Sequence, residues 1–126
     1  WKLLDEADIS IGHNSSDYDN KRLNTRFIVH GMRLPRQYKT IDTLKLARSM
    51  FAFSSNKLDA LGKFLGVGEK VEHEGFSMWI DCLKGDKKAL LKMVEYNRGD
   101  VLLLESVYNV LKDGLKPTKQ PKTGWK

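Results

Sequence analysis

The chain is poor in the residues that build cross-linked or metal-stabilised scaffolds. Its 126 residues include one cysteine, Cys82, and three prolines. A single cysteine excludes an intramolecular disulfide and a cysteine-rich zinc site, and it favours a reducing, cytoplasmic setting. Cys82 is therefore expected to be a small core residue of a helix. No apolar run approaches the ~20 residues of a membrane span, so we expect no membrane-spanning segment.

The sequence also lacks an initiator methionine and a signal peptide at its first residues. It opens with Trp1, inside what reads as the end of an amphipathic helix over residues 1–7. We therefore expect the chain to be a fragment of a longer polypeptide, with room for further domains fused at either end.

Negative charge is the minority sign in this chain. Lys and Arg number 22 against 16 Asp and Glu, which gives a formal net charge of +6 at pH 7. A positive surface attracts polyanions such as nucleic acids, although the same charge also fits a solvated surface that keeps a protein in solution. Part of the excess lies in residues 113–126, where lysines stand among Gly and Pro. We expect a basic, flexible tail or linker there, after a domain over residues 1–112.

Hydrophobic periodicity predicts a helix-rich α/β protein. Residues 8–12 alternate polar and apolar and predict a strand, whereas residues 40–44 predict either a second strand or the start of a helix. Between them, a serine at 15 or 16 is expected to cap a helix that runs to about His30. Four residues are expected to face inward around this helix: Tyr18, Leu23, Phe27 and Ile28.

The C-terminal part of the chain reads as helical. Helices are expected over about residues 54–66, over residues 76–83 with Gly85 as the stop, and over about residues 86–112. Gly99 costs ~1 kcal/mol relative to Ala in mid-helix, so we expect a kink or a break there. One or two strands are not stable alone, because their backbone groups need neighbours. Partner strands are therefore expected upstream or from another source.

Asp19 is the first residue with a candidate role in chemistry. It lies near the start of a predicted helix, six residues after His13 at the end of the predicted strand. A carboxylate there can simply stabilise the helix N-terminus, and Asp17 could do so equally well. Alternatively, Asp19 lies at the open end of a sheet, where it could bind a metal ion that contacts a scissile phosphate.

Tyr96 and Asp100 form a second candidate pair. Their spacing of four residues puts them on one face of a continuous helix. A phenol and a carboxylate there could position an attacking water molecule and hold a divalent cation. The alternative is structural: Asp100 would cap a helix that begins at Val101, while Tyr96 packs in the core.

Three polar residues are candidate nucleic-acid contacts. His13 and Asn14 follow the first predicted strand directly, and neutral donors beside a metal site suit nucleotide binding. Their structural alternatives are a hydrogen-bonded core histidine and an Asx turn. Lys57 could contact phosphate, or it could belong to a solvated basic face.

Taken together, these stretches resemble a known family. The run from Gly12 to Asp19, His-Asn followed by Tyr-Asp, is similar to the second motif of the DEDD superfamily of 3′–5′ exonucleases, usually written H-N-G-x-x-F-D. Tyr96-x-x-x-Asp100 resembles the third motif of the tyrosine-using (DEDDy) subgroup, and the segment between the two motifs resembles phage and bacterial members. The family's first motif, an Asp-x-Glu on an N-terminal strand, is absent from the 126 residues.

The resemblance implies a ribonuclease-H-like fold, here a helix-rich α/β fragment with part of a mixed sheet and without its N-terminal strands. It also implies a two-metal phosphodiesterase, in which two Mg²⁺ or Mn²⁺ ions lie ~4 Å apart. Asp19 and Asp100 would be metal ligands, and Tyr96 would orient the attacking water. Because Asp-x-Glu would supply the other two carboxylates, we expect the chain alone to be inactive or nearly so.

The predicted function is therefore that of a metal-dependent 3′–5′ exonuclease acting on single-stranded 3′ ends of DNA or RNA. Its expected location is the cytoplasm, or the host cytoplasm if a phage encodes it. A related alternative is the proofreading exonuclease domain of a DNA polymerase. Two other classes stay open: a non-catalytic nucleic-acid-binding remnant of the fold, and a helical interaction domain whose motifs are coincidental.

Overall fold

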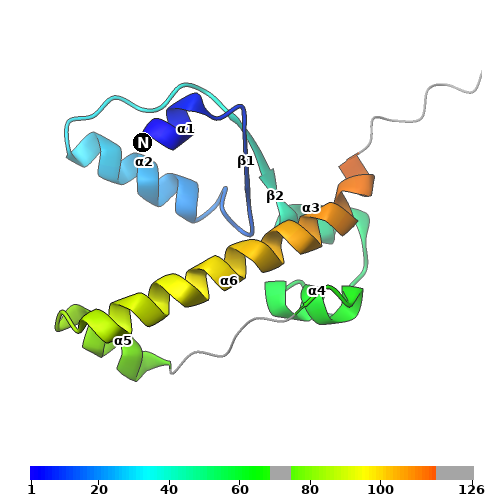
Figure 1. The fold of residues 1–126 in the computed structure, drawn as a ribbon. Coiled ribbons are helices and arrows are strands. Elements are labelled where there is room, and N and C mark those ends of the chain that lie inside the picture. Colours follow the sequence, from blue (N-terminus) through cyan, green and yellow to red (C-terminus); the bar gives the residue numbers. More distant parts are fainter. Residues whose placement is uncertain (69–74, 116–126) are drawn as a thin grey trace, which may run out of the picture. The chain divides into compact units, whose positions relative to one another are not determined.

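The computed structural model describes residues 1–68 and 75–115, which belong to two compact units. Unit 1 comprises Trp1–Asn56 and Leu111–Lys126, and unit 2 comprises Lys57–Val110. The elements of unit 1 are α1 (Lys2–Glu6), β1 (Ile9–Gly12), α2 (Asp19–Val29), β2 (Lys39–Asp42), α3 (Thr43–Met50) and the 3₁₀ turn η1 (Lys112–Leu115). Unit 2 holds α4 (Leu58–Leu65), α5 (Phe76–Leu83) and all but the last residue of α6 (Lys87–Leu111) (Figure 1).

The two strands form a parallel pair in which Ile9 faces Lys39 and Gly12 faces Asp42. Parallel neighbours need a long crossover connection, and α2 lies in that connection. Residues 40–44 were expected to be either a strand or the start of a helix, and they are both: β2 ends at Asp42 and α3 begins at the next residue. The prediction of a helix-rich α/β chain with part of a sheet is confirmed.

The predicted start of α2 is wrong. The helix begins at Asp19, and the residue in the N-cap position, Tyr18, makes no side-chain capping bond. Neither predicted serine caps it: the Ser16 hydroxyl donates to Asp42, and the Ser15 hydroxyl is buried without a hydrogen-bond partner. Ser16 does not cap the helix because its hydroxyl bonds to a stronger, charged acceptor, the carboxylate of Asp42 on the neighbouring strand.

The predicted inward face of α2 is also largely wrong. Phe27 is buried, but Tyr18, Leu23 and Ile28 are 52%, 41% and 60% exposed. Tyr18 precedes the helix, and its ring carries the Arg22 guanidinium at 4.3 Å from the ring centre. Such a cation–π contact stabilises an aromatic ring at the surface.

The long segment between α2 and β2 is tied to α1. The backbone N–H of Arg36 donates to the Asp5 carboxylate at 2.8 Å, and its guanidinium donates to the Asp5 carbonyl oxygen. The Trp1 indole N–H donates to the Arg33 carbonyl oxygen at 2.7 Å. A helix of five residues leaves most of its backbone groups without helical partners, so these bonds to a distant segment keep α1 in place.

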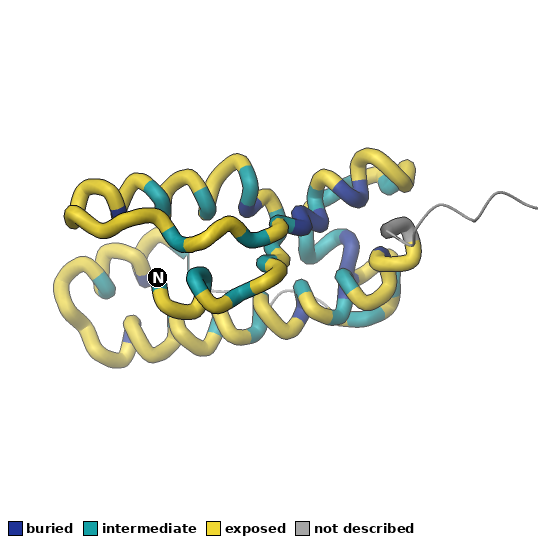
Figure 2. Tube along the Cα trace, turned by 90° about the horizontal axis from the view of Figure 1, so that it is seen from above, coloured by how far each residue is buried: buried dark blue, intermediate teal, exposed yellow. Residues whose placement is uncertain are grey.

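The buried residues of unit 1 concentrate where β2 passes into α3 (Figure 2). Ile41 and Asp42 at the end of the strand are buried, and so are Thr43, Leu46 and Ala47 of the helix. Each fully buried large apolar side chain contributes ~1.5–3 kcal/mol, so this short run is the principal core of the unit.

Unit 2 follows the predicted helix ends closely. Gly66 ends α4 in the left-handed conformation, with φ of 68°, and Gly85 follows α5 with φ of 83°. Cys82 on α5 is half-buried, with its sulfur 3.0 Å from the Met93 sulfur of α6. Among the described helices, none is long and apolar enough to cross a membrane.

The predicted break at Gly99 is wrong, because α6 runs unbroken from Lys87 to Leu111. A single mid-helix glycine costs ~1 kcal/mol. Burial of Leu103 and Val107 on the same helix outweighs that cost, at ~1.5–3 kcal/mol for each fully buried side chain. The predicted basic tail lies outside the described residues from residue 116 onward.

A second glycine, Gly62, sets the packing of unit 2. A Cβ atom at this position would collide with the Gly68 carbonyl oxygen and with Cδ1 of Leu103. We predict that Gly62→Ala lowers the free energy of unfolding by ~1–3 kcal/mol despite the better helix propensity of Ala, because overpacking a core outweighs propensity. Urea denaturation measures the change, with Asn97→Ala on the exposed surface of α6 as a control. Equal stability of both variants would show that the contact is loose.

Candidate functional site

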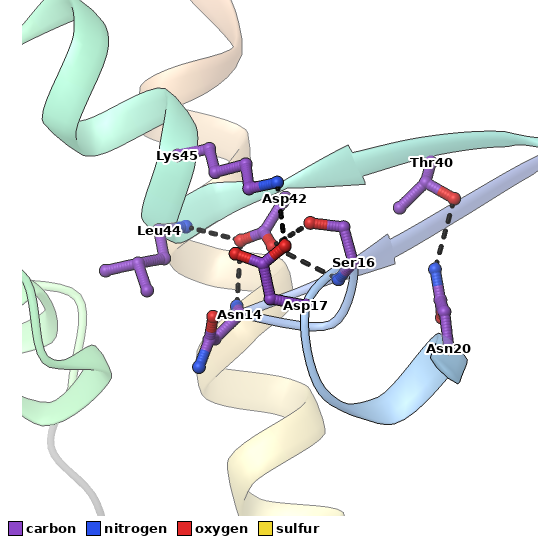
Figure 3. A network of polar contacts seen from close by, with 8 residues as sticks. All are labelled: Asn14, Ser16, Asp17, Asn20, Thr40, Asp42, Leu44 and Lys45. Atoms are coloured by element: carbon purple, nitrogen blue, oxygen red, sulfur yellow. Dashed lines mark hydrogen bonds and ion pairs between the residues drawn. The ribbon is translucent and has the colours of Figure 1, made fainter. Parts of the chain in front are cut away.

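One carboxylate from β2 holds the loop between β1 and α2. Asp42 is buried, and its Oδ1 accepts hydrogen bonds from the backbone N–H groups of Asn14 at 2.8 Å and Leu44 at 3.0 Å. Its Oδ2 accepts from the hydroxyl of Ser16 at 2.9 Å and from the backbone N–H of the same residue at 3.2 Å (Figure 3). One side chain therefore caps α3 and orients the loop that leads to Asp19.

Local sequence explains why the loop takes this shape. Asn14 adopts the left-handed conformation, with φ of 61°, which asparagine tolerates better than most residues. Gly12 has no side chain, and the Ser15 side chain occupies the place where a Cβ of residue 12 would lie. The backbone can therefore turn sharply after β1 and present two N–H groups to Asp42.

The charge of Asp42 is stabilised by these bonds. Burial by itself raises the pKa of the carboxyl, because it penalises the charged form. The hydrogen bonds from Asn14, Ser16 and Leu44 stabilise that form more strongly, and the pKa is lowered from its ordinary value of 3.8. The ionised carboxylate therefore stabilises the fold above pH 3.8, and this contribution is lost as the pH falls through the lowered pKa.

We predict that Asp42→Asn lowers the free energy of unfolding by ~1–3 kcal/mol at neutral pH, because buried donors lose their charged acceptor. The variant should also lose less stability than the parent on acidification below pH 3.8. Urea denaturation at neutral and acidic pH measures both effects. The matched control is Asp17→Asn, which removes only an exposed ion pair with Lys45 and should cost less than ~1 kcal/mol. Equal losses in the two variants would contradict the role of Asp42.

His13 connects the end of β1 to two other segments of unit 1. Its Nδ1 lies 2.8 Å from the Thr43 hydroxyl oxygen, and its Nε2 lies 2.8 Å from the Asn56 carbonyl oxygen. A carbonyl only accepts, so Nε2 carries a proton and donates to it. In the neutral ring Nδ1 then accepts from Thr43, whose one hydroxyl proton can otherwise go to the Gly12 carbonyl oxygen at 3.1 Å. Both ring nitrogens are bonded within the chain.

The pKa of His13 is lowered from its ordinary value of 6.5, chiefly because burial penalises the charged ring. The hydrogen bond to Asn56 and the charge of Asp42 act in the opposite direction, and Arg48 adds to the lowering. His13 is therefore mostly neutral at pH 7. Because the unfolded state binds the proton more readily, the stability associated with neutral His13 is lost as the pH falls below 6.5.

We predict that His13→Gln reduces the decline of unfolding free energy as the pH falls from 7 to about 5, because glutamine does not titrate there. A series of urea unfolding curves over this range tests the expectation. His30→Gln is the control, since His30 is an exposed histidine of the same unit whose ring is hydrogen-bonded to the Arg26 side chain. If the decline disappeared in His30→Gln and persisted in His13→Gln, the pH dependence would come from His30, and the prediction for His13 would be wrong.

Asp19 is the exposed carboxylate that this loop presents. It occupies the first turn of α2, and no hydrogen bond or ion pair of its side chain occurs within residues 1–68 and 75–115. Its neighbour Asp17 is engaged by Lys45, with Nζ 3.2 Å from Oδ1. Asp17 is therefore paired within the chain, whereas Asp19 can bind a ligand. The sequence alone did not distinguish the two residues.

Asn14 and Tyr18 stand on the same loop with their side chains exposed. The Asn14 side chain takes no part in the Asp42 network, which uses only its backbone (Figure 3). Tyr18 is stacked by Arg22, so an aromatic ring and a cation lie next to Asp19 in the chain. Nucleobases stack on aromatic rings and phosphates attract cations, so this loop can contact a nucleotide.

Tyr96 and Asp100 share one face of α6. The helix is continuous across both, so the alternative in which Asp100 caps a new helix is wrong. Both side chains are half-buried, on the side of the helix that carries the buried residues Ala89, Leu103 and Val107. A phenol and a carboxylate in a partly desolvated place interact more strongly with a bound ion than they would in water.

The candidate residues are divided between the two units. His13, Asn14 and Asp19 belong to unit 1, whereas Lys57, Tyr96 and Asp100 belong to unit 2. Lys57 is exposed and immediately precedes α4. No group of three or more His, Cys, Asp and Glu side chains that could hold a metal ion occurs in the described part of the chain. Joint metal binding by Asp19 and Asp100 stays a prediction.

Asp42 is the residue whose importance the motif reading missed. The available signal was an aspartate after an alternating segment and before a helical one, which is a helix-capping pattern. That pattern indicates the bond to Leu44, but the bonds to Asn14 and Ser16 join residues 28 and 26 positions apart. Only the parallel pairing of β1 and β2 brings these segments together.

A family model described as the RNase_H superfamily matches residues 1–112 of the chain. The matched range includes every candidate residue of both units. No curated protein and no solved structure matches the chain.

Proposed function

The chain belongs to the RNase_H superfamily, and on this premise we propose that it is part of a 3′–5′ exonuclease that removes nucleotides from single-stranded DNA or RNA. Membership suggests a nuclease-type function and a nucleic-acid substrate. The direction of hydrolysis, the single-stranded end and the roles of individual residues are the proposed refinements.

The observation that carries the proposal is the state of Asp19. Its loop is fixed by Asp42, its neighbour Asp17 is used by Lys45, and its own carboxylate has no partner among the described residues. A preorganised, exposed carboxylate at the start of a helix suits a group that binds a ligand rather than one that stabilises the fold. We assign it to metal binding, with Asp100 as a second ligand and Tyr96 as the group that orients water.

Carboxylate oxygens of this kind suit Mg²⁺ or Mn²⁺, which in a nuclease activate water and stabilise the leaving oxygen. The two assigned carboxylates are fewer than a two-ion site uses, so the chain by itself does not fit a complete metal centre. We propose that the remaining carboxylates come from polypeptide outside these 126 residues. Hydrolysis is therefore expected only from a protein that contains both parts.

The substrate contacts follow from charge and exposure. Residues 1–56 hold nine Lys and Arg against six Asp and Glu, while residues 57–110 hold eight against nine. The positive excess therefore lies in the unit that carries Asp19 and the stacked Tyr18. Asn14 is exposed beside it, and we assign to Asn14 and Tyr18 contacts with the terminal nucleotides. We assign to Lys57 a contact with a phosphate group of the substrate. We assign to His13 the role of fixing the end of β1, through its hydrogen bonds with Thr43 and Asn56.

We predict that a longer protein containing this chain and its upstream sequence shortens 5′-labelled single-stranded oligonucleotides from the 3′ end when Mg²⁺ or Mn²⁺ is present. Asp19→Asn and Asp100→Asn should each reduce the rate more than ~100-fold, because loss of a direct ligand exceeds the loss of its supporting contacts. Asp17→Asn, two residues away and paired with Lys45, should stay near the parent rate. Unchanged degradation by the Asp19 and Asp100 variants would refute the assignment.

A second candidate is a non-catalytic nucleic-acid-binding member of the superfamily. The finding that favours it is the absence of a cluster of three metal-binding side chains among the described residues. The two functions separate cleanly in the longer protein. Binding of a fluorescent single-stranded oligonucleotide without metal-dependent products would support the non-catalytic function, whereas a ladder of shortened products would support the exonuclease.

A further inference from the structure

Helix α6 is apolar on two opposite sides. One side carries the buried residues Ala89, Leu103 and Val107, together with Tyr96 and Asp100. At 100° per residue, five more large apolar residues fall within a ~120° sector on the other side. These residues, here called the outer stripe, are between 44% and 69% exposed: Leu90, Leu91, Val94, Val101 and Leu102.

The outer stripe differs from ordinary scattered surface hydrophobics. Its residues recur at helical spacing over about three turns of one helix, and between Leu90 and Leu102 the one charged side chain in the same sector is that of the exposed Arg98. A helix that is hydrophobic on all sides is normally covered on all sides. Contiguous exposed apolar patches on soluble proteins usually mark an interaction surface. We therefore expect the outer stripe to be covered by a binding partner.

The order of residues along the stripe indicates which occupant it fits. Leu90 and Leu102 lie at equal distances before and after residue 96, and so do Leu91 and Val101. A second α6 placed antiparallel, with a two-fold axis level with residue 96, would bring these four residues to matching heights, with Leu90 against Val101 and Leu91 against Leu102 of the partner subunit. A two-fold interface needs this kind of self-complementarity, because the same patch serves both partners.

The charges that flank the stripe have the same symmetry. Lys87 and Glu105 also lie at equal distances from residue 96, and both project in the angular sector of the stripe. Both are exposed, and within the described residues neither takes part in an ion pair. In the antiparallel arrangement Lys87 would face Glu105 of the partner subunit at each end, whereas a parallel pair would place like charges together. We propose that the outer stripe binds a second copy of this chain as an antiparallel, two-fold dimer.

The expected strength follows from the size of the contact. The segment from Lys87 to Glu105 spans ~27 Å of helix at 1.5 Å per residue. One helix pair buries less than the ~800 Å² per partner of a standard interface, so dissociation in the micromolar range is expected. The contact is separate from Tyr96 and Asp100, which lie on the other side of the helix, and it does not depend on the proposed exonuclease function.

Analytical ultracentrifugation of the 126-residue chain over a range of concentrations tests the proposal. The expected result is a reversible doubling of the 14.5 kDa monomer mass. Leu91→Glu should abolish the doubling, while circular dichroism reports whether the helices are retained. Leu83→Glu is the matched control. It makes the same chemical change outside the stripe, at a residue of α5 that is 85% exposed. A monomer at every concentration, or equal effects of the two variants, would overturn the proposal.

Charge reversal then tests the antiparallel register independently of folding. Lys87→Glu and Glu105→Lys should each weaken self-association by roughly tenfold or more, because each creates two like-charge contacts per dimer. An equimolar mixture of the two variants should dimerise again, since every contact then joins opposite charges. A mixture that associates no better than either variant alone would rule out this register, even if the chain forms dimers by another surface.

Discussion

The ionised side chain of Asp42 is the constraint on which the described part of unit 1 depends. It ends β2, caps α3, and receives the backbone of the loop after β1, so three local structures share one set of hydrogen bonds. Because four donors converge on a buried carboxylate, replacing any one of them leaves the others still bonded, whereas losing the carboxylate leaves all of them without an acceptor. Asp42 serves the candidate site without belonging to it, because it fixes the backbone that presents Asn14, Tyr18 and Asp19.

The candidate residues are divided between two units, and the proposed active centre would be assembled from several parts. The loop of unit 1 carries an exposed carboxylate and a stacked aromatic ring, and α6 carries a half-buried phenol and carboxylate. Membership of the RNase_H superfamily makes a nucleic-acid substrate the natural target of such groups. The number of carboxylates is the limiting quantity, since divalent ions that carry out phosphodiester hydrolysis need several anionic ligands. A chain with two assigned ligands is accordingly proposed as one contributor to a larger active centre.

The features that sequence predicted well are those that depend on neighbours in the chain. The ends of α4 and α5 were predictable because Gly66 and Gly85 stop a helix through their own backbone conformation. The start of α2 was not, because the Ser16 hydroxyl bonds to a strand 26 residues away. The break expected at Gly99 failed for a related reason: propensity acts within one turn, but burial of Leu103 and Val107 stabilises the whole helix. The motif spacing indicated Asp19, Tyr96 and Asp100 as candidates, whereas the difference between Asp17 and Asp19 required the position of Lys45.

The sequence distance across the Asp42 network also has a consequence for how the protein forms. Asn14 and Asp42 are 28 residues apart, so their bond closes a long loop, and the entropy of that closure must be overcome before any of the four bonds stabilises the chain. Helix α2 can form locally, but the loop in front of it cannot take its final shape until Asp42 and Leu44 are available. During synthesis, the segment that carries Asp19 therefore cannot take its final shape until some 25 further residues have been made. We therefore expect the loop to become ordered together with the strand pair and the first turn of α3.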